Sequence, residues 1–134
     1  MNEIVVLDTN VIISSIFWMG NSNKIVNLAI EQKKTNFTSP QLLNELAKVL
    51  RKKFKVPEDK IEEQVALVAK YSQITEPKIK IKAIKEDPFD DKVLECALSC
   101  DADYIVTGNW HLLELGTYKG IKIAKPKEFL DLMS

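Results

Sequence analysis

The apolar and polar residues of this chain follow two alternating patterns, one typical of strands and one of helices. Short apolar runs rich in β-branched residues occur at Ile4–Leu7 and Tyr104–Val106 and predict strands that are buried on both faces of a parallel sheet. Briefer runs at Asn36–Thr38 and Ile121–Ile123 indicate two further strands. A weaker signal in the stretch 72–84 hints at another strand, at Ile79, Ile81 and Ile74.

Between these strands, apolar residues recur at intervals of three and four, which is the spacing of amphipathic helices. The predicted helices are 11–19, 22–30 (capped by Ser22 or Asn23), 40–54 (capped by Ser39), 57–71, 87–101, 109–115 and a last helix after Pro126. Strands that alternate with helices predict a three-layer α/β/α fold with a central parallel sheet of four to five strands. Because no linker, repeat or low-complexity run interrupts the pattern, residues 1–134 are expected to form a single domain.

Composition excludes several classes of protein. The 19 basic and 19 acidic side chains cancel, which excludes a polycationic coat for DNA but leaves room for a local basic patch. Cys96 and Cys100 are spaced as packing residues of a helix and do not form a disulfide framework. The single histidine, His111, cannot complete a zinc site with them. The start of the chain does not resemble a signal peptide and no apolar stretch is long enough to span a membrane, so we expect a cytoplasmic protein without membrane contact.

Polar residues stand where the predicted strands end. Asp8 directly follows the strand at Ile4–Leu7, and Asn109 lies just past the strand at Tyr104–Val106. Asp90 lies in the first turn of the helix that leads to that second strand. Ligands of open α/β sheets bind outside the carboxyl ends of the strands, and acidic clusters there favour hard cations such as Mg²⁺ or Mn²⁺. A nucleophilic triad and a phosphate-binding glycine loop are both excluded, because neither motif occurs in the sequence.

Each of these carboxylates also has a purely structural interpretation. Asp8 is a candidate helix cap, although Thr9 and Asn10 beside it are capping residues too. Glu45 borders the apolar stripe of its helix and is spaced to pair with Lys48. The segment Asp87–Asp91 makes a good helix start, with Asp87 as cap, but Asp90 falls on the inward stripe, where a carboxylate is costly unless it is paired or binds a cation. Asp91 is the second choice for this position.

Four stretches of the chain resemble the PIN-domain family of small metal-dependent ribonucleases, which includes the VapC-like toxins of toxin–antitoxin pairs. They are Val6–Ile12, Ser39-Pro40 with Glu45, Asp87–Ala97 and Ala102–Leu113. The resemblance places the family's first three acidic positions on Asp8, Glu45 and Asp90, with Asp91 as the alternative to Asp90. The fourth position is usually the aspartate of a Thr-x-Asp signature, and here it is Asn109 after Thr107. Because asparagine carries no charge, we expect weaker cation binding than in a relative with four carboxylates.

The resemblance implies an endoribonuclease that uses Mg²⁺ or Mn²⁺ and acts as the toxin of a toxin–antitoxin pair. Asp8 and Asp90 would hold the cation, and Glu45 would bind it or orient water, while Thr107 and Asn109 would donate hydrogen bonds to the phosphate or to a water. The resemblance also implies an antitoxin partner and a homodimer. An alternative is a weakened or inactive PIN-like fold that binds RNA or protein, which Asn109 favours. A phosphohydrolase with an aspartyl nucleophile is a third hypothesis, weakened by Asn10, where that chemistry requires an acid.

Two further features bear on substrate and partner. The densest basic run of the chain is Lys48, Arg51, Lys52, Lys53 and Lys55. From it we expect Arg51 and Lys52 to bind substrate, the alternative being a solvated helix end whose cations favour the helix dipole. Phe17 and Trp18 are adjacent large aromatic residues. We expect them in the core or on a dimer face rather than stacked on bases.

Overall fold

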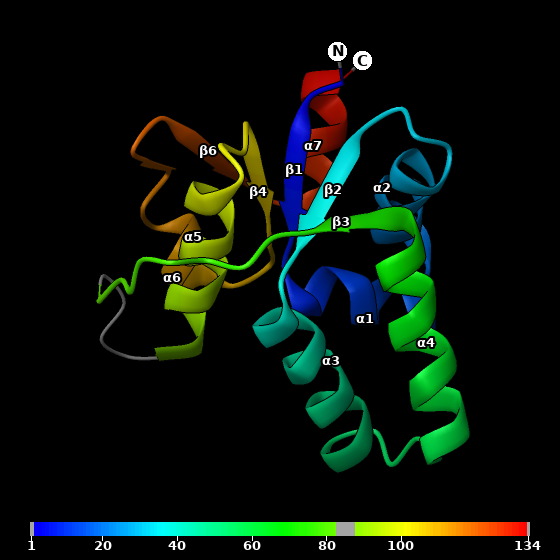
Figure 1. Ribbon diagram of the computed structural model, residues 1–134. Coiled ribbons are helices and arrows are strands. Elements are labelled where there is room, and N and C mark those ends of the chain that lie inside the picture. Colours follow the sequence, from blue (N-terminus) through cyan, green and yellow to red (C-terminus); the bar gives the residue numbers. More distant parts are fainter. Residues whose placement is uncertain (1, 83–87, 134) are drawn as a thin grey trace.

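The computed structural model describes residues 2–82 and 88–133, which fold around one sheet (Figure 1). The strand order is β3-β2-β1-β4-β6-β5. All neighbouring strands are parallel except β5 and β6, which form a short antiparallel pair. The strands are β1 (Ile4–Leu7), β2 (Thr35–Thr38), β3 (Ser72–Ile74), β4 (Tyr104–Val106), β5 (Thr117–Tyr118) and β6 (Ile121–Ala124).

Helices pack on both faces of this sheet. They are α1 (Thr9–Phe17), α2 (Gly20–Ile30), α3 (Pro40–Lys52), α4 (Glu58–Tyr71), α5 (Pro88–Ser99), α6 (Trp110–Leu113) and α7 (Pro126–Met133). Alternate residues of β1 separate two apolar cores, as expected for a strand covered on both faces. Val5 and Leu7 belong to the core with α1, α2, α4 and α7, whereas Val6 belongs to the core with α5 and α6. The predicted three-layer arrangement is therefore confirmed.

The sheet differs from the sequence prediction at its two edges. It contains six strands rather than four to five, because β3 and β5 are edge strands of three and two residues that the apolar pattern does not reveal. Within the described residues 72–82 of this stretch, only Ser72–Ile74 forms a strand. Ile79 is 67% exposed, and the backbone N–H of Ile81 donates to Glu95 Oε2 (2.9 Å) instead of to a neighbouring strand. The predicted cap, Asp87, lies outside the described residues.

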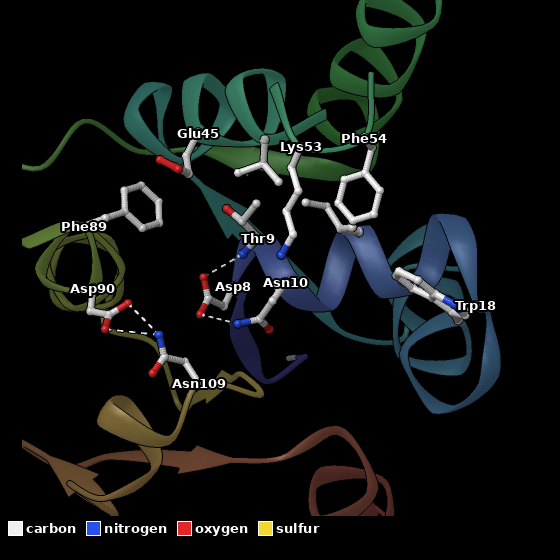
Figure 2. Close-up of a pocket in the computed structure, with 12 residues that line it drawn as sticks. Asp8, Thr9, Asn10, Trp18, Glu45, Lys53, Phe54, Phe89, Asp90 and Asn109 are labelled. Atoms are coloured by element: carbon white, nitrogen blue, oxygen red, sulfur yellow. Dashed lines mark hydrogen bonds between the residues drawn. The ribbon is translucent and has the colours of Figure 1, made fainter. Parts of the chain in front are cut away.

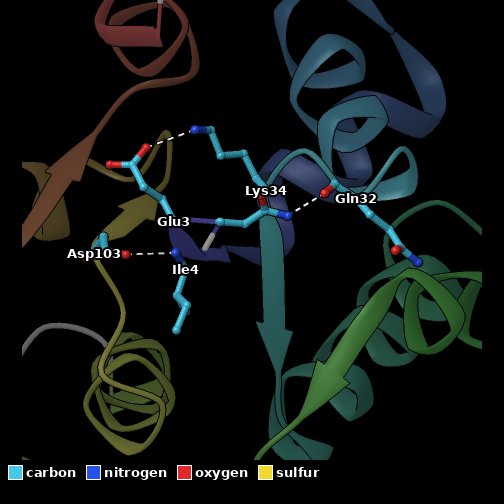
Figure 3. Close-up of polar contacts among 6 residues, drawn as sticks. Glu3, Ile4, Gln32, Lys34 and Asp103 are labelled. Carbon is cyan, nitrogen blue, oxygen red and sulfur yellow. Dashed lines mark hydrogen bonds and ion pairs between the residues drawn. The ribbon is translucent and has the colours of Figure 1, made fainter.

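The amino-terminal end of β1 is fixed by polar contacts, shown in Figure 3. The backbone N–H of Ile4 donates to Asp103 Oδ2 (2.8 Å), and Lys34 pairs with Glu3 (2.9 Å). The Asn2 amide donates to the carbonyl oxygen of Gln32. These contacts join the segments that precede β1, β2 and β4 at the end of the sheet opposite to the polar residues predicted to form the site.

The order of the central strands creates the place where a ligand site is expected. β1 pairs with β2 on one side and with β4 on the other, so the chain connections diverge between β1 and β4. Open α/β sheets bind ligands at such a topological switch point, outside the carboxyl ends of the strands. Leu7 pairs with Val106 across it, which brings Asp8 and Thr107 next to each other. Among the described residues, no helix has the length and apolar character to cross a membrane.

Candidate active site

A pocket of about 370 Å³ lies at this switch point (Figure 2). Its volume falls within the range that is typical of small-ligand sites. Four of the five predicted catalytic residues line it, namely Asp8, Glu45, Asp90 and Asn109. They come from the end of β1, from α3, from α5 and from the segment after β4, so the fold brings together residues that are far apart in the sequence.

Asp8 is buried, and three neighbouring groups hold its carboxylate in place. Its Oδ1 accepts a hydrogen bond from the backbone N–H of Thr9 (2.7 Å), which caps α1, where the positive end of the helix dipole favours a negative charge. Its Oδ2 accepts from the Thr107 hydroxyl (2.7 Å) and from the Asn10 amide (3.1 Å). The structural interpretation of Asp8 thus describes one of its two oxygens, and the other is held by side chains from two different segments.

Thr107 differs from its predicted role. Its side chain is fully buried and does not line the pocket, and its hydroxyl donates to Asp8 rather than pointing toward a substrate. The same hydroxyl oxygen accepts from the backbone N–H of Asn109 (3.0 Å), and the Asn10 side-chain oxygen accepts from the N–H of Gly108 (3.1 Å). Thr107 is therefore a positioning residue, which fixes the turn after β4 to the start of α1.

Asp90 and Asn109 form a two-pronged contact. The Asn109 amide nitrogen donates to both carboxylate oxygens of Asp90, at 3.1 and 3.2 Å. The Asn109 side-chain oxygen accepts from the backbone N–H of His111 (2.9 Å) and so caps α6. Asn109 thus directs nitrogen, not oxygen, toward Asp90. Asp90 is 2% exposed, and a carboxylate this deeply buried requires such donors.

The two remaining acidic candidates occupy different surroundings. Asp91 is buried but does not line the pocket, which favours Asp90 over Asp91 as the site residue of α5. Glu45 is half-buried on α3 and lines the pocket wall. Figure 2 shows the ring of Phe89 between Glu45 and Asp90, so Glu45 faces the pocket from the side opposite to Asp90.

Comparison with known proteins identifies the family. The PIN domain family model matches residues 4–111. The chain belongs to the PIN domain family. An uncharacterized protein of Methanocaldococcus jannaschii, MJ1680, is 31% identical over 140 residues, which cover 95% of this chain and 89% of that protein.

Two solved structures share the PIN fold of this chain. One is the structure of VapBC-1 from nontypeable Haemophilus influenzae, with a TM-score of 0.66, 18% identity, and coverage of 92% of this chain and 98% of that chain. The other is VapBC2 from Rickettsia felis bound to a DNA fragment from its promoter, with a TM-score of 0.61, 17% identity, and coverage of 91% and 98%. PIN domains are typically metal-dependent nucleases that generally use Mg²⁺.

The donor atoms of this PIN domain suit a hard cation, because Asp8, Glu45 and Asp90 offer only oxygen. The described residues contain no group of three or more His, Cys, Asp and Glu side chains that could hold a metal ion together. Asp8, Glu45 and Asp90 thus line one pocket, and their binding of a common cation stays a prediction. Mg²⁺ commonly binds through one or two protein carboxylates and keeps several waters, and Asp8 and Asp90 are the buried carboxylates that line this pocket.

The basic residue at the pocket of the PIN domain is Lys53, not the predicted Arg51 or Lys52. Neither of those two lines the pocket, and Arg51 forms a two-point contact with Glu58 (2.7 and 3.2 Å) that raises the pKa of its guanidinium. Lys53 follows α3 and lines the pocket with Glu45 and Val49. These three residues are spaced four apart, so they share one side of the helix. That spacing is the signal in the sequence that distinguishes Lys53 from its neighbours.

Aromatic residues form the other part of the lining, namely Trp18, Phe54 and Phe89. The sequence predicts Phe17 and Trp18 in the core or on a dimer face; exposed fractions of 41% and 66% exclude the core, and the dimer face stays a prediction. The hydrophobic run of the first helix predicted that it continues to Met19. The helix ends at Phe17, and Met19 has a φ of +58°, so the chain turns and leaves Trp18 at the surface.

Proposed function

We propose that this PIN domain is an endoribonuclease that hydrolyses RNA phosphodiester bonds with Mg²⁺ or Mn²⁺. The observation that carries the proposal is the placement of Asp8 and Asp90, both almost completely buried, at the lining of one pocket at the topological switch point. Membership of a family that typically consists of metal-dependent nucleases supports it. Buried carboxylates are costly to keep, and a cation-dependent site gives them a use.

The chain's own residues divide the work as follows. Asp8 and Asp90 would hold the cation, whose chemistry when bound is to activate water and to offset the charge that builds on the phosphate oxygens. Glu45 would bind the cation or orient the attacking water. Asn109 positions Asp90 through its two hydrogen bonds, and Thr107 positions Asp8. Hydrolysis would consume one water. Its oxygen bonds to phosphorus as the P–O bond to the leaving oxygen breaks, one of its protons passes to solvent, and the leaving oxygen takes up a proton from solvent.

We also propose that the protein is the toxin of a toxin–antitoxin pair in the cytoplasm. In this proposal residues 1–134 form one domain, and two copies form a homodimer. The likeness in fold to two VapBC structures supports an antitoxin as protein partner. Co-expression with the product of a small neighbouring reading frame, followed by purification of a stable complex, tests this part of the proposal.

A cleavage assay on structured RNA tests the nuclease. We expect cleavage with Mg²⁺ or Mn²⁺, none with EDTA, and a loss of at least about 100-fold in Asp8→Asn, as is usual when a group that acts on the reacting atoms is removed. Asp59→Asn is the matched control, since Asp59 is exposed on α4 outside the pocket. Equal cleavage by Asp8→Asn and the wild type would assign the activity to a contaminating nuclease or to another site.

A PIN domain that binds RNA or protein without cleaving is the second candidate. The specific observation in its favour is the contact of Asn109 with both oxygens of Asp90, which occupies a carboxylate that a cation would need. Titration with Mg²⁺ and Mn²⁺ distinguishes the two functions. Absence of binding at millimolar concentration would favour the non-cleaving module, and saturable binding that Asp8→Asn abolishes would favour the nuclease.

A further inference from the structure

Three aromatic rings from two distant segments form a cluster beside the carboxylates. Phe17 and Phe54 are stacked with their ring centroids 4.6 Å apart. Trp18 meets Phe54 edge to face at 6.0 Å and Phe17 at 5.7 Å. Phe54 is half-buried against the core and anchors the other two rings. We call Trp18 with Phe17 and Phe54 the aromatic shelf.

The aromatic shelf is exposed to solvent, although burial of its rings would stabilise the fold. Trp18 is 66% exposed and Phe17 is 41% exposed, while full burial of a large aromatic side chain stabilises a protein by about 1.5–3 kcal/mol. The residue that follows Trp18 adopts a backbone conformation that non-glycine residues avoid, since Met19 has φ +58° and ψ −113°. Exposed apolar patches and strained backbone both concentrate at ligand sites.

The shelf and the carboxylates belong to the same pocket. Trp18 and Phe54 line it together with Asp8 and Asp90. Lys53 lies between the two ends, as Figure 2 shows, with its ammonium group 5.8 Å from the centre of the Phe54 ring. None of the ion pairs among the described residues involves Lys53. Along the pocket, the carboxylates are followed by the ammonium group of Lys53 and then by the aromatic rings.

We propose that Trp18, supported by Phe54, stacks on an unpaired base of the RNA strand, and that Lys53 contacts a phosphate between this base and the carboxylates. The identity of the strand as RNA rests on the function proposed above. Nucleotides alternate a negative phosphate with a flat aromatic base, which is the order of groups along the pocket. Stacking on aromatic side chains requires a base whose face is open, so the shelf selects single-stranded or looped RNA over a duplex.

Binding of a labelled single-stranded oligonucleotide in EDTA tests the shelf without cleavage. Trp18→Ala is expected to bind at least about tenfold more weakly, which is the usual loss for one stacked base, and Trp18→Phe is expected to retain most of the affinity. Trp110→Ala is the matched control, since Trp110 is 61% exposed but does not line the pocket. An oligonucleotide with abasic positions is expected to bind wild type and Trp18→Ala equally.

Three results would overturn the proposal. They are an unchanged affinity in Trp18→Ala, an equal loss in Trp110→Ala, and a persistent effect of Trp18→Ala on the abasic strand. A change of oligomeric state in Trp18→Ala with unchanged RNA affinity would assign the shelf to self-association instead. Because the assay contains no divalent cation, a protein that binds in this Trp18-dependent way but never cleaves would refute the nuclease and leave the shelf supported.

Discussion

From the contact of Asn109 with Asp90 we expect residue 109 to set how the stability of the fold responds to a cation, and Asn109→Asp tests this directly. The substitution replaces the amide that donates to Asp90 at 3.1 and 3.2 Å with a second carboxylate at about the same place. Two unit charges 3.1 Å apart repel by roughly 5 kcal/mol at an effective dielectric constant of about 20. Uptake of a proton by one carboxyl group and small shifts in position relieve part of this, so we expect a loss of about 2–4 kcal/mol in the free energy of unfolding.

A divalent cation is expected to offset most of this loss of stability. The new carboxylate adds one negative charge to the ligands, and cation affinity rises with the number of charged ligands. A hundredfold gain in affinity adds up to about 2.7 kcal/mol of stability at saturating metal, because a bound ligand stabilises the folded state.

Urea unfolding in EDTA and in 10 mM MgCl₂ measures both halves of the prediction. Asn27→Asp adds the same charge on the exposed side of α2 and is the control. The reasoning fails if Asn109→Asp is as stable as the wild type in EDTA, or if Mg²⁺ stabilises it no more than it stabilises the wild type.

Two further predictions concern other parts of the fold. Thr107→Val removes the hydroxyl that donates to Asp8 and accepts from the N–H of Asn109. We expect a loss of about 1–3 kcal/mol in the free energy of unfolding, measured in urea, and a reduction in cleavage larger than this loss explains. Unchanged cleavage would show that Asp8 does not need the Thr107 hydroxyl. Burial raises the pKa of Cys96 to about 12, so the unfolded chain releases this proton first and stability falls as the pH rises from about 9 toward 12. In Cys96→Ala the free energy of unfolding is expected to fall less steeply with pH, by up to about 1.4 kcal/mol per pH unit. Parallel slopes for both proteins would contradict the assignment of this effect to Cys96.

The strands and the acidic residues of the pocket follow from local features of the sequence. Ile4–Leu7 and Tyr104–Val106 are apolar without interruption because they are covered on both faces, and that is visible in the residues alone. A polar residue at the end of such a strand lies at the edge where ligands bind. This rule predicts the positions of Asp8 and Asn109, and the helical spacing of the apolar residues predicts that of Asp90.

Features that depend on tertiary contacts cannot be predicted from the sequence alone. The side-chain amide of Asn109 contains both an oxygen and a nitrogen. Because its oxygen accepts from the N–H of His111, its nitrogen faces Asp90. Likewise, β3 is a strand because its backbone pairs with β2, and Ser72–Ile74 has no apolar run of its own. The exposure of Trp18 depends on a turn at Met19. Methionine is not typical of such a turn, so the sequence does not predict it.

Asp90, Asn109, Thr107 and Asp8 are linked by continuous hydrogen bonds, and this explains how the site accommodates an asparagine. Asn109 donates from its side chain to Asp90 and from its backbone to the Thr107 hydroxyl, which in turn donates to Asp8. Both buried carboxylates therefore keep hydrogen-bond donors when no cation is present. An aspartate at position 109 would break the first of these links and make the stability of the fold more sensitive to a cation. The asparagine thus carries one negative charge less than an aspartate and holds Asp8 and Asp90 in one hydrogen-bonded arrangement.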